Sequence, residues 1–107
     1  MRRVWVSRDE EVTGSMVSTW LQSWGVSRDE RTRTWTVYER RDDRGYSDWD
    51  AKSEIGSTSC ATADEAVLVL MDEEAGMSEE ALLEAVRAVD HPAMRELEAA
   101  VLRQRGS

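Results

Sequence analysis

The sequence predicts an α+β fold, with a small antiparallel β-sheet from the N-terminal half packed against two or three C-terminal α-helices. All five Trp and both Tyr lie before residue 50, among short β-rich segments separated by polar turns. Residues 61–105 contain no aromatic residue, and they combine helix-capping patterns with apolar residues at helical spacing. A length of 107 residues is typical of a single domain, so we expect one domain over 1–107.

The N-terminal part contains one clear element and one ambiguous one. Residues 3–6 predict a short strand, because β-branched and aromatic residues dominate there. Residues 15–24 fit a helix, since the spacing i, i+3, i+4, i+7 is occupied by Val17, Trp20, Leu21 and Trp24. The Ser, Thr, Val and Trp content of the same segment favours a strand. We favour the helix and leave the strand open as the alternative.

A β-hairpin is predicted from residue 32 to residue 51. Residues 32–40 alternate, with Trp35 and Val37 on one face and Thr or Tyr on the other. The polar segment 41–45 ends in Gly and predicts the turn, after which residues 46–51 return as a second strand. Residues 54–59 predict a third short strand, weakened by Gly56.

Three helices are predicted after residue 60. Thr62 and Glu65 form a capping-box pattern before the apolar run 66–71, and Gly76 ends this helix. Ser78 caps the second helix, whose apolar stripe consists of Leu82, Leu83, Val86 and Val89. Pro92 fits the first turn of a third helix, and Met94, Leu97 and Val101 line that helix.

The residue inventory argues against catalysis. One His and one Cys cannot assemble a conventional zinc site, and no phosphate-binding or nucleophile-elbow motif is present. Cys60 and His91 are a nucleophile–base alternative, although a free Cys is more simply a small buried apolar residue. Residues 48–54 depart from a calcium loop at Lys52. We expect no enzymatic activity, no catalytic residue, no metal and no cofactor.

Negative charge is concentrated in the C-terminal half. Residues 61–100 carry eleven carboxylates and two cations, whereas residues 1–60 are nearly neutral and the whole chain has a charge of −8. Such a field attracts basic partners and repels nucleic acid. The expected partner-binding surface is the acidic cluster around the first inter-helix turn, formed by Asp72, Glu73, Glu74, Glu79, Glu80 and Glu84. Residues 72–74 have no local reason to be acidic, because negative charge is unfavourable at a helix C-terminus. A merely solvated, solubilising face is the alternative.

The leading hypothesis is a non-enzymatic protein-binding module that inhibits or regulates a basic, nucleic-acid-handling host or defence protein. Acidic proteins of phages and mobile elements, including anti-CRISPR proteins that mimic DNA, are the analogous class. The first alternative is single-stranded nucleic-acid binding, with a contact surface formed by Trp20, Trp24, Arg40, Arg41 and Arg44. Interleaved acids argue against such direct binding. The second alternative is a homo-oligomeric assembly protein, and a homodimer is left open.

The chain carries no apolar run long enough to span a membrane, and its single Cys cannot form an internal disulfide. These two features predict a cytoplasmic protein without a membrane partner.

Part of the chain resembles a known family. Residues 35–39, the turn at Gly45 and Tyr46, and the path from Gly56 through Cys60 into residues 62–70 are similar to HicB-type antitoxin domains. The first 30 residues and the last two predicted helices do not follow that pattern. The resemblance implies a hairpin, a third strand and a helix, on a scaffold that binds and blocks another protein.

Overall fold

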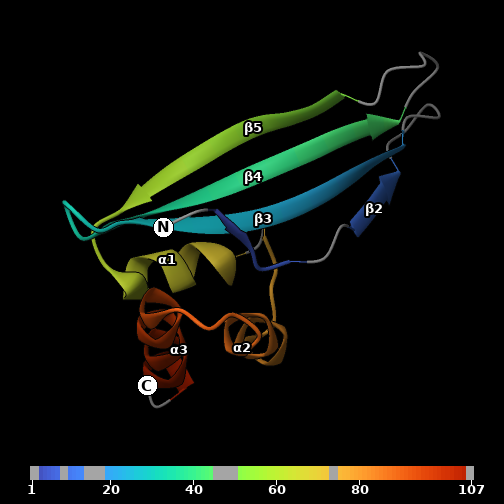
Figure 1. Ribbon diagram of the computed structural model, residues 1–107. Helices are drawn as coiled ribbons and strands as arrows, with labels where there is room; N and C mark the ends of the chain where they lie inside the picture. Colours follow the sequence, from blue (N-terminus) through green and yellow to red (C-terminus); the bar gives the residue numbers. More distant parts are fainter. Residues whose placement is uncertain (1–2, 8–9, 14–18, 45–50, 73–74, 106–107) are drawn as a thin grey trace.

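An antiparallel sheet from the N-terminal half and three helices from the C-terminal half form the predicted α+β fold (Figure 1). The computed structural model describes residues 3–7, 10–13, 19–44, 51–72 and 75–105. Within these ranges, 10–13, 19–21, 41–44 and 51–55 are described at the level of the backbone.

The sheet contains β1 (Val4–Trp5), β2 (Glu10–Thr13), β3 (Thr19–Asp29), β4 (Thr34–Arg44) and β5 (Ala51–Cys60). Its order is β1-β3-β4-β5, every pairing is antiparallel, and β2 pairs with β3 beyond the end of β1. β1 and β2 therefore lie in tandem along one edge of β3, while β4 occupies the other edge. This arrangement leaves β1 at the border of the sheet.

Two sequence predictions in this half were wrong. Residues 19–24 belong to β3 rather than to a helix, because all of them pair with β4 and residues 19–22 also pair with β2. Residues 15–18 lie outside the described range. The preference of Val, Thr and Trp for strands outweighed the helical spacing of the apolar residues in this segment. The predicted turn at 41–45 is also misplaced, since residues 41–44 continue β4 in register with both neighbouring strands.

The outcome of the predicted second and third strands can be stated for residues 51–59. Residues 46–50 lie outside the described range, and the predicted strand at 54–59 is part of the single strand β5. A register shift between Glu39 and Arg40 marks an irregularity in the pairing of β4 with β5.

The helices α1 (Ala63–Leu70), α2 (Glu79–Arg87) and α3 (Pro92–Arg105) cover one face of the sheet at one end (Figure 1). The other end of β3, β4 and β5 extends beyond them (Figure 1). The sheet contributes Val26, Trp35 and Val37 to the core, where each is at most 1% exposed. The predicted helical stripes are confirmed, because the core includes Leu82, Leu83, Val86, Met94, Leu97 and Val101.

Local capping fixes where α1 and α2 begin. The Thr62 hydroxyl accepts the Glu65 N–H at 3.2 Å, and the Glu65 carboxylate accepts the Ala61 N–H at 2.8 Å. The Ser78 hydroxyl accepts the Ala81 N–H at 3.1 Å. Both predicted helix starts are therefore confirmed, although α1 ends at Leu70, earlier than Gly76.

A charged contact ties α3 to the sheet. Arg28 of β3 is only 8% exposed and forms an ion pair with Glu96 of α3. Its guanidinium also lies 5.7 Å from the ring centroid of the buried Trp35. Because a buried guanidinium requires a partner, this pair fixes the position of α3 beneath β3.

Candidate functional site

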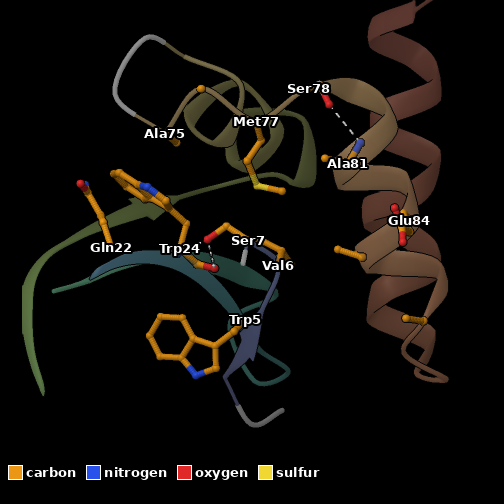
Figure 2. Close-up of a pocket in the computed structure, with 13 residues that line it drawn as sticks. Trp5, Val6, Ser7, Gln22, Trp24, Ala75, Met77, Ser78, Ala81 and Glu84 are labelled. Carbon is orange, nitrogen blue, oxygen red and sulfur yellow. Dashed lines mark hydrogen bonds between the residues drawn. The ribbon is translucent and has the colours of Figure 1, made fainter. Parts of the chain in front are cut away.

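A groove of about 810 Å³ lies between α2 and the sheet border formed by β1 (Figure 2). Its sheet side comes from β1, the two residues after it and β3, and its helix side comes from the chain between residues 75 and 88. The lining residues that matter most are Val6, Ser7, Trp24, Met77, Ala81, Glu84, Ala85 and Ala88.

The sheet side of the groove is fixed by hydrogen bonds around Trp24. The N–H groups of Val6 and Ser7 both donate to the Trp24 carbonyl, at 2.9 and 3.2 Å. The Ser7 hydroxyl in turn accepts the Trp24 N–H. Two successive donors on one carbonyl are the arrangement found at a β-bulge, a feature that often re-aims side chains at sheet borders. Trp24 is held against the helical layer with 8% of its surface exposed.

The helix side is open because its side chains are short. Ala81, Ala85 and Ala88 recur at i, i+4 and i+7, so they share one face of α2. The larger residues Leu82 and Val86 point into the core instead. Figure 2 shows Met77 beside Trp24 on one side of the groove and Ala81 on the side of α2 toward them, whereas Glu84 lies at the edge of α2 away from Trp24. The result is a slot in which Trp24, Met77 and the alanines lie beside the polar groups of Ser7, Gln22 and Ser78.

The polar groups of the groove are acidic or neutral. Glu84 contributes to its lining, and Glu80 lies one helical turn earlier on α2; both side chains are exposed. Gln22, at the sheet side, donates a hydrogen bond to Glu39 of β4. Among the lining residues that the structure describes, none is Lys or Arg. The groove therefore favours a cationic group over an anionic one.

The predicted acidic cluster is only partly gathered at this groove. Glu80 and Glu84 lie on α2 as above, whereas Glu79 forms an ion pair with Arg105 of α3. Glu73 and Glu74 lie outside the described residues.

Asp72 has a local structural role. Its carboxylate accepts the Ala75 N–H at 3.1 Å, and its carbonyl accepts the Gly76 N–H at 2.7 Å. The expectation that acids after α1 lack a local reason was therefore wrong for Asp72.

Several other acids of the helical layer are matched by arginines of the same chain. The ion pairs are Asp64–Arg103 at 2.9 Å, Glu98–Arg87 at 2.5 Å, Glu98–Arg95 at 3.2 Å and Glu96–Arg28. The hydrogen bonds from Arg103 hold the pKa of Asp64 below its usual value. Because these acids are paired within the chain, fewer carboxylates contribute to the negative field than the composition indicates.

Two residues of the alternative contact surface, Trp24 and Arg40, lie on opposite faces of the sheet. Trp24 lies opposite Glu39 in the sheet, so the next residue, Arg40, points to the other face. There the Arg40 guanidinium lies 4.1 Å from the Trp5 ring centroid, and its Nε donates to the Ser23 hydroxyl at 3.1 Å. Trp20, Arg41 and Arg44 lie in β3 and β4, within segments described at the level of the backbone.

A second cation–aromatic pair lies on the same uncovered face. The Arg3 guanidinium is 4.1 Å from the Tyr38 ring centroid, and the Ser27 hydroxyl is 3.2 Å from the Tyr38 hydroxyl. The hydrogen bond with Ser27, helped by Arg3, lowers the pKa of Tyr38. These side chains therefore cover the part of the sheet around Gly25 on the face opposite the helices.

Cys60 and His91 have separate local roles. Cys60 is a core residue, and its burial raises the pKa of its thiol. His91 precedes α3, and its Nδ1 accepts the Ala93 N–H at 3.0 Å. The described ranges contain no group of three or more His, Cys, Asp or Glu side chains placed to hold a metal ion. Across the same ranges, no helix has the length and apolar character needed to cross a membrane.

Sequence reasoning missed Ser7 and the alanines of α2. The i, i+4, i+7 spacing of Ala81, Ala85 and Ala88 is visible in the sequence and could have indicated a stripe of small residues. Ser7 carries no such signal, because its role depends on where β1 pairs along β3.

No family model, curated protein or solved structure was found to match this chain. The resemblance to HicB-type antitoxin domains thus has no support from these comparisons, and functional inference rests on the site itself.

Proposed function

We propose that the chain is a non-catalytic protein-binding module that inhibits or regulates a basic partner protein. The observation that supports this function best is the groove between α2 and β1. It combines the Trp24 ring and short Ala side chains with polar groups that include the carboxylate of Glu84. Binding sites are typically concave and mostly apolar, with a few polar groups that select the ligand.

Charge gives this groove a preferred partner. A net charge of −8 steers basic proteins toward the molecule, while Glu84 offers a carboxylate at the rim of the groove. Nucleic-acid-handling proteins carry the basic surfaces that such a field attracts. We therefore propose a partner of this kind, held in the groove rather than along a strip of acids that imitates phosphates.

The geometry supports a groove over a phosphate-like strip because of the internal ion pairs. Asp64, Glu79, Glu96 and Glu98 each pair with an arginine of the same chain. Their charges are compensated locally, so they contribute little to the attraction of an external cation.

The test is a quantitative pull-down from nuclease-treated lysate of the native host, with the wild type and three variants as baits. Glu84→Lys reverses the groove charge, and Ala81→Trp fills the slot from an exposed position. Glu30→Lys is the control, because it reverses an exposed carboxylate in the β3–β4 turn, outside the groove; it also removes the 3.9 Å contact of Glu30 with Arg28, so its fold is checked before it is used.

The wild type and Glu30→Lys should retain the same basic protein, and both groove variants should retain it about tenfold less or weaker still. Circular dichroism of each bait checks that the fold is kept. If both groove variants retain as much of the partner protein as the wild type does, the partner does not bind in this groove.

A further inference from the structure

We infer that the partner binds as an extended segment that adds a β-strand to the border of β1 and sends alternate side chains into the groove. This inference rests on the proposed function and specifies the conformation and the chemistry of the occupant. Three observations carry it: the orientation of the β1 backbone, the short side chains of α2 and the position of Glu84.

The backbone of Trp5 faces outward from the sheet. Val6 donates its N–H to Trp24 of β3, and Trp5 lies opposite Gly25 in the antiparallel register. Residues of an antiparallel strand direct their N–H and C=O groups alternately to the two sides. Trp5 therefore presents both groups away from β3. No strand among the described ranges pairs with that side of β1.

The groove offers space for the side chains of such a strand. Neighbouring strands lie about 4.8 Å apart, and every second side chain of an added strand would point toward the helical layer. Figure 2 shows α2 standing across the groove from Val6, while the Trp5 ring points away from Met77 and Trp24. Small or aliphatic side chains would fill the space beside Ala81 and Ala85.

Glu84 sets the charge of the occupant. It is the acidic residue among the described groove-lining residues, and it lies at the rim of the groove, where it also borders a hollow lined by Arg87 and Arg105. A Lys or Arg at the position of the segment nearest this rim would lie closest to the carboxylate. The occupant is thus an extended segment with small or aliphatic residues at alternate positions and a cation at one of them.

A strand fits these features better than a helix. A helix satisfies its own backbone and would leave the Trp5 N–H and C=O without a protein partner. An added strand uses main-chain hydrogen bonds for affinity and side-chain pockets for specificity, which is the pattern of β-strand addition.

The test uses a phage library of random dodecapeptides selected on the immobilised full chain. Synthetic peptides from the selection are titrated into the wild type, Glu84→Lys, Ala81→Trp and the control Glu30→Lys by calorimetry. Binding should weaken about tenfold or more in the two groove variants and stay unchanged in the control. Each peptide is also made with N-methyl groups on one or the other alternate set of backbone amides.

Hydrogen exchange of single amides reports the strand directly. A bound peptide should slow exchange of the Trp5 amide about tenfold or more, and one of the two N-methylated sets should lose binding. The Val6 amide, already bonded to Trp24, is the internal comparison.

The two failures are distinguishable. Peptides that depend on Glu84 and Ala81, but leave Trp5 exchange unchanged and tolerate both N-methylated sets, would overturn strand addition alone. If no selected peptide discriminates the wild type from the groove variants, groove binding and strand addition both fail.

Discussion

Gly25 shows how one residue shapes the face opposite the helices. A Cβ at this position would lie 2.8 Å from Cε3 of Trp5, which is closer than real contacts allow. The glycine thus permits the Trp5 ring to lie flat against β3, where Arg40 then stacks on it. Absence of a side chain at one position therefore organises three strands.

We predict that Gly25→Ala destabilises the fold by about 1–3 kcal/mol, because the Trp5 ring must move away from β3. Gly56→Ala is the matched control: it is also a strand glycine, and its nearest atom would be a Glu39 carboxylate oxygen at 4.0 Å. That change should stay within about 0.5 kcal/mol. Urea unfolding of both variants measures the difference, and equal losses would contradict the close-approach argument.

At the scale of elements, ion pairs connect parts of the chain that lie far apart in sequence. Arg28 and Glu96 join β3 to α3, and Asp64 and Arg103 join the first turn of α1 to the last turn of α3. The second pair is exposed to solvent, so its contribution is small and depends on the ionisation of Asp64.

The Asp64–Arg103 pair predicts a pH dependence. Because the folded pKa of Asp64 lies below its ordinary value of 3.8, the pair stabilises the fold above that value. This stabilisation is lost as pH falls through the lowered folded pKa. Asp64→Asn should therefore melt slightly below the wild type at pH 7, with the difference closing below about pH 4.

Arg103→Gln is the matched variant and should show the same convergence in thermal melts between pH 2 and pH 7. The double variant should lose less than the sum of the two single variants, since both single variants remove the Asp64–Arg103 pair. A melting difference that stays constant over the whole pH range would show that the charge pair is not its cause.

The sequence predicted elements well where the signal is local. Thr62 and Ser78 cap helices through residues three positions away, so their patterns can be read directly. The end of β4 could not be read in this way. Residues 41–44 look like a polar turn, yet they remain in a strand because β3 and β5 both pair with them. Such pairing depends on distant residues that a local pattern does not include.

The candidate site was predicted only in part, for a related reason. Glu80 and Glu84 were named from charge, and of these two Glu84 lines the groove, whereas Glu80 borders the neighbouring hollow beside Arg87 and Arg105. Trp24 was expected in an exposed helical surface, whereas β3 turns its ring toward the helical layer. Ser7 acts through the register of β1 on β3, which no composition or spacing reveals.

At the scale of the whole molecule, the helices cover only one end of a long sheet. The extents are 43 × 29 × 22 Å, and Figure 1 shows β3, β4 and β5 running past the helices. The hydrophobic core is described around Val26, Trp35 and Val37 at the covered end. Resistance to opening should therefore differ along the same strands.

Native-state hydrogen exchange checks this unevenness. Amides of Val26 and Val37 should exchange only through global unfolding, whereas those at 19–21 and 42–44 should exchange through local opening at lower free energy. Exchange is followed by NMR at increasing low concentrations of urea. Equal free energies at both ends would show that the sheet opens as one unit.

The position of Trp24 at the groove predicts that its fluorescence changes when the groove is occupied. Its indole keeps 8% of its surface exposed and borders the groove, whereas Trp35 is 1% exposed inside the core. An occupant of the groove would remove the remaining water from the first indole and leave the second unchanged. In a chain where the other tryptophans are replaced by Phe, a blue shift of Trp24 emission would then count occupied grooves without any attached dye.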